Sequence, residues 1–452
     1  MTRSAWLLPA FAAAACQTYE PAPVDLPAHA QAFAARLPDA DAVRAFAERL
    51  TSPDPAGTGF DLTDGLSLGE ARFVALLGNP SLQVVRAESG VAAALAEFAG
   101  RWADPQLSGS FFYVLESMAQ NPWFAGVYVA QTLPITGLPG LEQELASSRH
   151  AGALLAVRTA EANVLNELEH AWAQLWAATQ RRAVLDDLVQ RLAELERTTA
   201  SLAATNVLTR LEARVFVLAG VRATAERTAV LGELEVAALR VRELLGLPPE
   251  LSLAFVPTLE LADRLPQTAR REGLQHGPLV AAAQNEHAIA ERELQVAIRR
   301  QWPELWIQPG WQEEDAEPRP AFGLALPIPL WNGNVQQIAA ERARRAVAAE
   351  HLKRQLETAT HALAQADARH RAAVAQRLLL ERDLLPAVAE QLADGKRLAE
   401  LGQLDTLLLL DAVTRSYEAQ LAVITATLAE AEALVARNSL FWPSLVNPVT
   451  ED

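Results

Sequence analysis

Long stretches of the chain place apolar residues three and four positions apart, which is the spacing of a helix that buries one face. Across residues 141–245 leucine and alanine recur in this way without any proline, and residues 335–440 carry a second such stretch. Helices with this pattern pair as coiled coils. The polar cluster SLAATNVLTR interrupts the first stretch, where Thr209 and Glu212 have capping-box spacing. The pattern therefore predicts two long helical hairpins.

Ahead of each helical stretch the pattern changes to aromatic and β-branched residues that alternate with polar ones. Residues 106–133 contain two such segments around a short polar turn, and residues 303–328 contain two more. Each pair of segments predicts a β-hairpin. In the first segment Leu107 and Phe111 fall on one face, while Ser108 falls on the other. Each strand has about 9 to 11 residues, the length that crosses a bilayer at a tilt.

The two halves of the chain are copies of one unit. The segment TLPITGLPGLEQELASS aligns with ALPIPLWNGNVQQIAAE, so that the strand-to-helix junctions pair Pro134 with Pro327 and Gly140 with Gly333. Duplication is the economical explanation, because prolines upstream of both segments keep a common offset. The chain then divides into a signal peptide (1–15), a lipid-anchored tether (16–64), repeat 1 (65–260), repeat 2 (261–443) and a C-terminal tail (444–452).

The first residues have the features of an export signal. Arg3 precedes the apolar run AWLLPAFAAAA, which ends in small residues just before Cys16. This pattern predicts a bacterial lipoprotein that is cut before Cys16 and acylated there, and ordinary cleavage beside an incidental cysteine is the alternative. Gln17 after the cysteine favours the outer membrane. The following tether, rich in proline and alanine, is expected to hold one helix near 41–50 and little core.

Composition narrows the classes of partner. The net charge of −16 argues against nucleic acid or an anionic lipid surface as the main partner. The single cysteine excludes a disulfide within the chain. We expect no membrane-spanning helix, because no stretch reaches the roughly 20 apolar residues that such a helix needs. A membrane passage would therefore use strands.

The distribution of tryptophan supports strands in a membrane. Six of the ten tryptophans lie in or beside the strand segments, as expected for the aromatic girdles of a barrel. Four strands cannot close a transmembrane barrel, whose minimum is about eight, and an open edge in lipid is costly. The barrel must be shared between chains, and three chains give twelve strands. These tryptophans are Trp102, Trp123, Trp302, Trp306, Trp311 and Trp331.

Three sets of residues resemble the TolC-like outer-membrane efflux factor family. They are LSLGEARFVALLGNPSLQVVRAE, the strand–LPI–turn–helix junctions, and the hairpin-tip motif LGQLDTLLLLDAVTRSYEAQ. The resemblance covers residues 65–443. It implies a mainly α-helical homotrimer whose twelve-stranded β-barrel lies in the outer membrane of a Gram-negative bacterium and continues as a periplasmic α-barrel. Such a conduit works with a periplasmic adaptor (a membrane fusion protein) and an inner-membrane pump.

By the same resemblance, the helix-hairpin tips near 203–214 and 401–411 close the periplasmic entrance and meet the adaptor. Family members often narrow this entrance with a ring of acidic residues, which repel one another and favour cations. Proline removes a helical hydrogen bond, so Pro386 should kink its helix, and we place this kink near the middle of the tunnel.

The residues of the constriction remain open at this stage. Leu408 occupies a position that is acidic in some relatives, so the constriction involves Asp405 or Asp411, or is hydrophobic. Their counterparts in the first repeat are Asn206 and Glu212, beside the capping Thr209. In the alternative interpretation, Asp405 is only the N-cap of the last helix.

The sequence carries no catalytic or metal-binding motif. It has no glycine-rich phosphate loop, no HExxH and no CxxC. Asp367 and His370 share a helical face, but such pairs are common on solvated coiled coils. Two methionines and one cysteine provide no series of soft metal ligands. We therefore expect a passive channel for small solutes, with no enzyme activity, cofactor or bound metal.

Two other functions compete with a channel. A periplasmic adaptor would need a lipoyl-like domain split around one helical hairpin, whereas this chain has two helical hairpins and two β-hairpins. A structural coiled-coil lipoprotein would not need duplicated strands of membrane length. The sequence favours the channel, but it does not choose among drugs, metal ions and other solutes as cargo.

Overall fold

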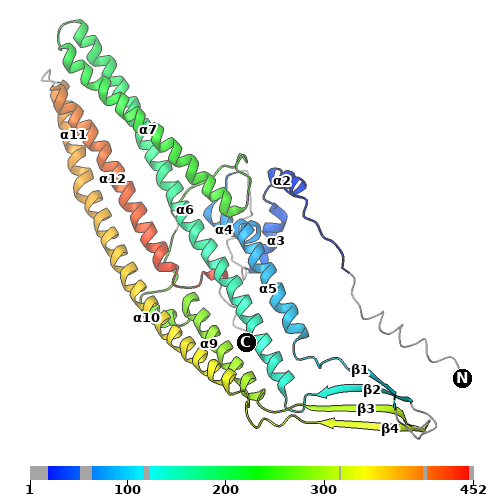
Figure 1. Cartoon of the computed structure of the whole chain (residues 1–452). Coiled ribbons are helices and arrows are strands. Elements are labelled where there is room, and N and C mark those ends of the chain that lie inside the picture. The colour runs from blue at the N-terminus through cyan, green and yellow to red at the C-terminus, as the bar shows by residue number, and fades with distance from the viewer. Residues whose placement is uncertain are drawn as a thin grey trace.

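The computed structural model describes residues 19–50, 64–113, 115, 123–259, 261–314, 317–400 and 405–446. The described chain is mostly helical and elongated, with a four-stranded sheet at one end and two helical tips at the other (Figure 1). Cys16 and the predicted cleavage site lie outside the described residues, as do residues 401–404 of the second tip.

One antiparallel sheet contains all four predicted strands. Its order is β1 (Gln106–Tyr113), β2 (Trp123–Leu133), β3 (Leu305–Glu314) and β4 (Glu317–Ala325). Each predicted hairpin is present, and β2 pairs with β3, so the two halves of the chain join in one sheet. β1 and β4 are left as its open edges.

The helices next to the sheet follow the same order as the strands. Neighbours in this layer are α5 (Pro80–Phe98), α6 (Leu138–Ala204), α9 (Pro278–Arg299) and α10 (Val335–Leu379). Each strand pair is therefore continued by a helix pair (Figure 1). Toward the tips, α7 (Arg210–Leu245) returns along α6.

The second tip is built by α11 (Leu385–Glu400) and α12 (Thr406–Asn438). The π-helical segment η1 (Leu380–Leu384) separates α10 from α11, and Pro386 follows directly. A wider helical turn accommodates the proline, which has no N–H for the regular ladder. The break lies on the tip side of the ion pair between Asp367 on α10 and Arg437 on α12.

Capping boxes mark the starts of two helices, one of which, at Thr209, was predicted. Ser67 and Glu70 form a reciprocal capping box at the start of α4 (Leu68–Gly78), and Thr209 and Glu212 form another at the start of α7. In each box the hydroxyl accepts a backbone N–H and the glutamate accepts from the cap residue. The predicted break between α6 and α7 is therefore confirmed.

The N-terminal segment differs from the expected tether. Besides the predicted helix, α3 (Ala40–Leu50), it contains α2 (Leu26–Ala34). Val43 on α3 is buried in the core beside α4, and Arg36 donates a hydrogen bond of 2.9 Å to the carbonyl of Gly246. The segment packs onto the middle of the molecule, because its few apolar residues complete a core supplied by other elements.

The expectation that no helix could span a membrane was wrong by length and composition. Within the described residues, one helix, α12, is long and apolar enough to do so. Core helices of soluble proteins pass the same test, and α12 packs against α6, α10 and α11. Within the described chain, 28% of this apolar stretch is buried.

The middle of the molecule holds the largest core cluster, which includes the fully buried Trp172 and Leu168 of α6. The short helices α8 (Arg270–Gln275) and η2 (Ser444–Val446) also lie in this region. Gly246 ends α7 in the left-handed conformation, with φ of 69°. A Cβ atom on Gly246 would lie 2.1 Å from the carbonyl oxygen of Gly78.

We predict that Gly246→Ala destabilises the protein by at least about 2 kcal/mol, because alanine is strained at positive φ and its methyl group meets backbone. Thermal unfolding followed by circular dichroism measures the change. Gly140→Ala is the control, since Gly140 lies in α6 with open space around it. Equal melting temperatures for both variants would contradict the prediction.

Candidate functional site

The sheet has one apolar face. Residues paired across antiparallel strands share a face, and the register aligns Leu107 with Val129, Val127 with Trp311, and Ile307 with Leu324. The side chains are large and exposed; Leu107 and Phe322, for example, keep about 70% of their surface (71% and 70%). This apolar face includes Leu107, Phe111, Tyr113, Trp123, Val127, Val129, Trp311, Phe322 and Leu324.

The opposite face is mostly polar. Tyr128 donates a hydrogen bond of 3.1 Å to Oε1 of Gln312, and Gln308 donates one of 3.3 Å to the hydroxyl of Ser108. The Tyr128 ring lies against Gly310, where a Cβ atom would come within 2.3 Å of it. These polar contacts therefore link β1, β2 and β3. The polar face also carries aromatic residues, namely the paired Phe112 and Phe124 near the loop end and Trp306 near the helix end.

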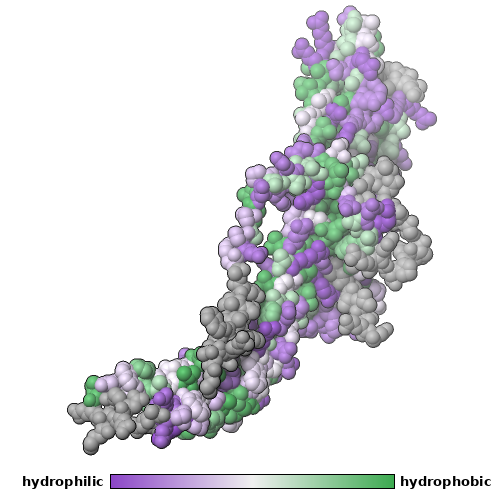
Figure 2. Space-filling view, turned by 90° about the vertical axis from the view of Figure 1, so that its right-hand side faces the viewer, coloured by the Kyte–Doolittle hydropathy of each residue, from purple (hydrophilic) through white to green (hydrophobic). Residues whose placement is uncertain are grey.

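Aromatic residues flank the apolar face at both ends of the strands. Near the loops, Trp123 packs on Phe111 and Tyr113 with ring centroids 4.8 Å apart in each pair. Near the helices, Trp302 and Trp331 are exposed. Figure 2 shows hydrophobic patches on the surface of the sheet end and along the helical shaft. A sheet with one apolar face, one polar face and aromatic borders is suited to separating lipid from water.

The helical layer also has open apolar edges. α5 exposes an apolar stripe at heptad-like spacing, and α10 exposes Val335 and Val347 on the other side of the layer. Large apolar patches of this kind mark interaction surfaces. The stripe on α5 consists of Val84, Val91, Leu95 and Phe98.

The strand-to-helix junctions lie where the alignment placed them, with one correction. Pro134 follows β2 directly, and Pro327 follows β4 after one residue. Gly333 has a positive φ of 40°, as expected for a turn, but Gly140 lies inside the first turns of α6. Gly137, with φ of 74°, is the left-handed N-cap residue of α6. Matching identical residues in the two segments did not reveal Gly137, because the turn before α6 and the turn before α10 differ in length.

The tips bring the predicted residues of the two repeats near each other. Asn206 takes φ of 60° in the turn between α6 and α7. Hydrogen bonds from Thr209 lower the pKa of Glu212, and the charge of Asp405 on the other tip opposes this shift. The carboxylate of Asp405 accepts the backbone N–H groups of Leu407 and Leu408 at 3.0 Å, so it does cap α12.

The other predicted tip residues have separate environments. Asp411 forms an ion pair of 2.8 Å with Arg415 on its own helix. Leu408 is exposed, and so are Leu407 and Leu211 at the starts of α12 and α7. The sequence left a hydrophobic constriction near Leu408 as one alternative. It did not identify Leu407 and Leu211, although leucines directly after an N-cap are a visible signal. The carboxylates at the tip are largely engaged in capping and pairing.

A polar contact joins the two helical hairpins near their tips. The hydroxyl of Tyr417 on α12 donates to the carboxylate of Asp187 on α6. Burial raises the pKa of Tyr417 to about 12, and the hydrogen bond to Asp187 adds to this shift. The tyrosine therefore remains a neutral donor at physiological pH.

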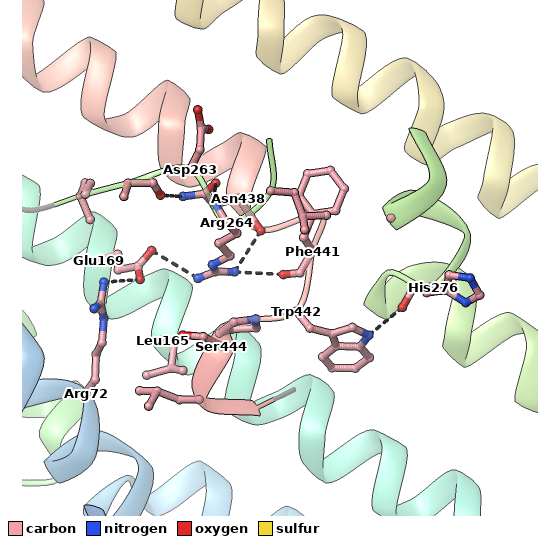
Figure 3. A pocket seen from close by; sticks show the side chains of 16 residues that line it. Arg72, Leu165, Glu169, Asp263, Arg264, His276, Asn438, Phe441, Trp442 and Ser444 are labelled. Carbon is pink, nitrogen blue, oxygen red and sulfur yellow. Dashed lines mark hydrogen bonds and ion pairs between the residues drawn. The ribbon is translucent and has the colours of Figure 1, made fainter. Parts of the chain in front are cut away.

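A cavity of about 470 Å³ in the middle of the molecule is lined by charged groups from distant parts of the chain (Figure 3). The buried carboxylate of Glu169 on α6 pairs with Arg72 of α4 at 2.8 Å and with Arg264 at 3.3 Å. Arg264 also donates to the carbonyls of Asn438 and Phe441, at 2.9 and 3.0 Å, and so caps the end of α12. Burial lowers the pKa of Arg264, and the Glu169 charge opposes this shift.

The charged groups of this network pair with one another across the fold. Trp442 adds a hydrogen bond of 2.7 Å to the carbonyl of His276. Asp367, which the sequence places beside His370, pairs with Arg270 and Arg437 at 3.1 and 3.3 Å. Within the described residues, no group of three or more histidine, cysteine and acidic side chains is placed to hold a metal ion.

We predict that Glu169→Gln destabilises the protein by about 3–5 kcal/mol, because Arg264 would lose its buried counter-charge. The matched control is Glu167→Gln on the same helix, whose exposed pair with Arg240 at 2.6 Å should contribute less than about 1 kcal/mol. Chemical unfolding of both variants measures the difference. A Glu169→Gln variant as stable as the control would show that the network contributes little.

Comparison with known proteins identifies the fold. No protein-family model matches the chain, and no curated protein sequence matches it significantly. Among solved structures, the outer-membrane channel OprN is similar over 84% of this chain and 90% of its own, with a TM-score of 0.71 and 19% identity. CusC, studied for folding and transmembrane channel formation, is similar over 83% and 92%, with a TM-score of 0.70 and 15% identity.

The outer membrane protein VceC from Vibrio cholerae is similar over 82% of this chain and 95% of its own, with a TM-score of 0.69 and 17% identity. The single chain thus has the fold of outer-membrane channel proteins, and the mainly helical chain fold implied by the resemblance to TolC-like efflux factors is confirmed.

Proposed function

We propose that this chain is one protomer of a trimeric outer-membrane channel, which passively carries small solutes in a tripartite efflux system. The observation that carries the proposal is the sheet with one apolar and one polar face and two open edges. A water-soluble protein would bury such a face. In a barrel, the apolar face meets lipid and the polar face lines water.

The number of copies follows from the sheet. Four strands cannot close a transmembrane barrel, and unpaired backbone groups in lipid cost several kcal/mol each. Three copies would supply twelve strands, with β4 of one copy beside β1 of the next. The helical layer has the same order, so the same arrangement covers the α5 stripe with α10 of a neighbour. The tunnel would thus continue the barrel.

The ends of this conduit suggest its partners. We propose that the tips form the periplasmic entrance and meet a periplasmic adaptor and, with it, an inner-membrane pump. The exposed Leu211, Leu407 and Leu408 support an apolar closure and docking surface, since the carboxylates of Glu212 and Asp405 already serve as caps. The constriction is then hydrophobic at Leu408 rather than a ring of free carboxylates.

The lipid anchor and the repeat boundaries remain part of the proposal. Cleavage before Cys16 and its acylation would attach the N-terminus to the outer membrane, with the helices reaching into the periplasm. The periplasmic adaptor is less suitable as an alternative, because the described residues contain one four-stranded sheet and no lipoyl-like domain.

The proposal predicts that protein extracted from outer membranes with detergent has the mass of a trimer and conducts ions in planar bilayers. Wild type labelled with a radioactive fatty acid should take up label, and Cys16→Ala should not. A water-soluble monomer without conductance would refute the channel. An unlabelled wild-type trimer would refute the lipid anchor alone.

The two faces of the sheet predict opposite effects of one charge. Val127→Lys places lysine on the apolar face and should cost about 2–4 kcal/mol near the bilayer midplane, so little protein should remain in membranes after urea washing. Ser108→Lys, on the polar face, should be retained like wild type. Equal retention of the two variants would place the apolar face out of contact with lipid.

A further inference from the structure

Three prolines lie within the strands of the second hairpin, namely Pro309 in β3 and Pro318 and Pro320 in β4. Proline has no backbone N–H, so it cannot complete a hydrogen-bonded pair in an antiparallel ladder. Residues along such a strand alternately turn their backbone groups toward one neighbour and toward the other. The position of each proline therefore shows which neighbour lacks a donor.

Pro309 establishes the direction in β3. The ladder between β2 and β3 pairs Tyr128 with Gly310 and Gln131 with Ile307, but it is interrupted between these pairs, opposite Pro309. The ladder between β3 and β4 continues without a break through Pro309 and Phe322. The missing donor of Pro309 thus points toward β2, and the residues two and four positions further along β3 turn their backbone groups the same way.

Pro318 and Pro320 consequently face away from β3. They lie opposite Glu313 and Trp311, whose backbone groups point toward β2. The backbone groups of both prolines, with no N–H, are turned to the open edge of the sheet. Along this edge, β4 presents four carbonyl groups from positions 318, 320, 322 and 324. It presents N–H donors only from Phe322 and Leu324.

On the open edge of β1, every outward-facing residue keeps both of its backbone groups. The same alternation, carried across β2, turns the backbone groups of Leu107, Gly109, Phe111 and Tyr113 outward. Each of these residues has both an N–H and a carbonyl group. The two edges that would meet between copies are therefore unequal: one offers four donors and the other offers two.

We propose that the seam between copies, formed by β4 of one and β1 of the next, is fully hydrogen-bonded only near the helices and opens from its outer end. The proposal rests on the trimeric channel proposed above. Near the helices, Phe322 and Leu324 can exchange both bonds with the neighbouring strand. Beyond them, Pro318 and Pro320 can only accept, so two carbonyl groups of the neighbouring β1 have no donor on β4.

The surroundings of Pro318 and Pro320 lower the energetic cost of the unpaired carbonyl groups. The cross-strand neighbour of Pro318 on the apolar face is the charged Glu313, and that of Pro320 is Trp311. Glu317 and Arg319 form an ion pair of 3.4 Å on the same strand. Charged and tryptophan side chains gather at the membrane–water boundary, where water can bond the unpaired carbonyl groups. In the hydrocarbon core the same loss would be prohibitive.

The duplication provides an internal comparison. When Leu133 is aligned with Leu326, Ala125 and Val127 of β2 take the positions equivalent to Pro318 and Pro320 of β4. Ala125 and Val127 pair with β3 inside the chain and keep both their donors. The proline pair thus occurs in the copy of the strand that faces a neighbouring chain. Edge prolines also hinder wrong strand pairing before assembly.

The test compares three purified oligomers in detergent: wild type, Pro318→Val/Pro320→Val and Pro309→Val. The rate at which each dissociates to monomers is followed on semi-native gels at a fixed elevated temperature. The double variant restores two donors per seam and should dissociate about tenfold more slowly or slower still. Pro309→Val, which restores a donor inside the chain and equally removes proline rigidity, should dissociate at about the wild-type rate.

The proposed seam is overturned if the double variant assembles but dissociates as fast as wild type. It is also overturned if Pro309→Val slows dissociation as much as the double variant does. If the double variant does not assemble, Pro320→Val alone is measured in the same way, with a severalfold slowing expected. If wild type itself is never oligomeric, the proposed channel fails, and the seam fails with it. An oligomeric, conducting wild type with an insensitive double variant leaves the channel and rejects only the seam.

Discussion

The need of every backbone N–H and C=O group for a partner governs this molecule. Its sheet leaves two edges unpaired. If the exposed apolar face meets lipid, water cannot bond all of the unpaired backbone groups along these edges. In the proposed channel, another copy of the same sheet satisfies both edges. The helices follow the strands in the same order, so closing the sheet also brings the exposed stripe of α5 to α10 of the next copy. In that proposed assembly, one constraint on the sheet would determine the arrangement of the whole shaft.

The middle of the molecule is built differently from its ends. Glu169, Arg72 and Arg264 tie α6 to α4 and to the end of α12, and they line the cavity beside them. At the sheet and at the tips, by contrast, large apolar side chains remain exposed. Regions whose groups are satisfied within one chain resist local opening, whereas surfaces without partners depend on assembly. This paired middle region therefore separates two ends that expose large apolar side chains.

Local signals in the sequence predicted most of the elements and few of the long-range contacts. Heptad spacing, alternation and the capping box at Thr209 depend on neighbouring residues, and the corresponding helices, strands and helix break are present. The link from Glu169 to Arg264 joins residues far apart in sequence, and no local pattern marks it. Gly137 was missed for a related reason, because matching letters were aligned without knowing which glycine has the positive φ.

The direction of the strand prolines needed both levels of information. From the sequence alone, Pro318 and Pro320 suggest an edge strand, since proline weakens a central one. Only the interrupted ladder opposite Pro309 reveals that their missing donors point away from the sheet. The same register shows that β1 and β4, the strands at the two open edges, offer unequal numbers of N–H donors. A trimer built from such copies has six contacts between hairpins, and the three between chains differ from the three within them. Any opening of the barrel would therefore begin where one chain meets the next.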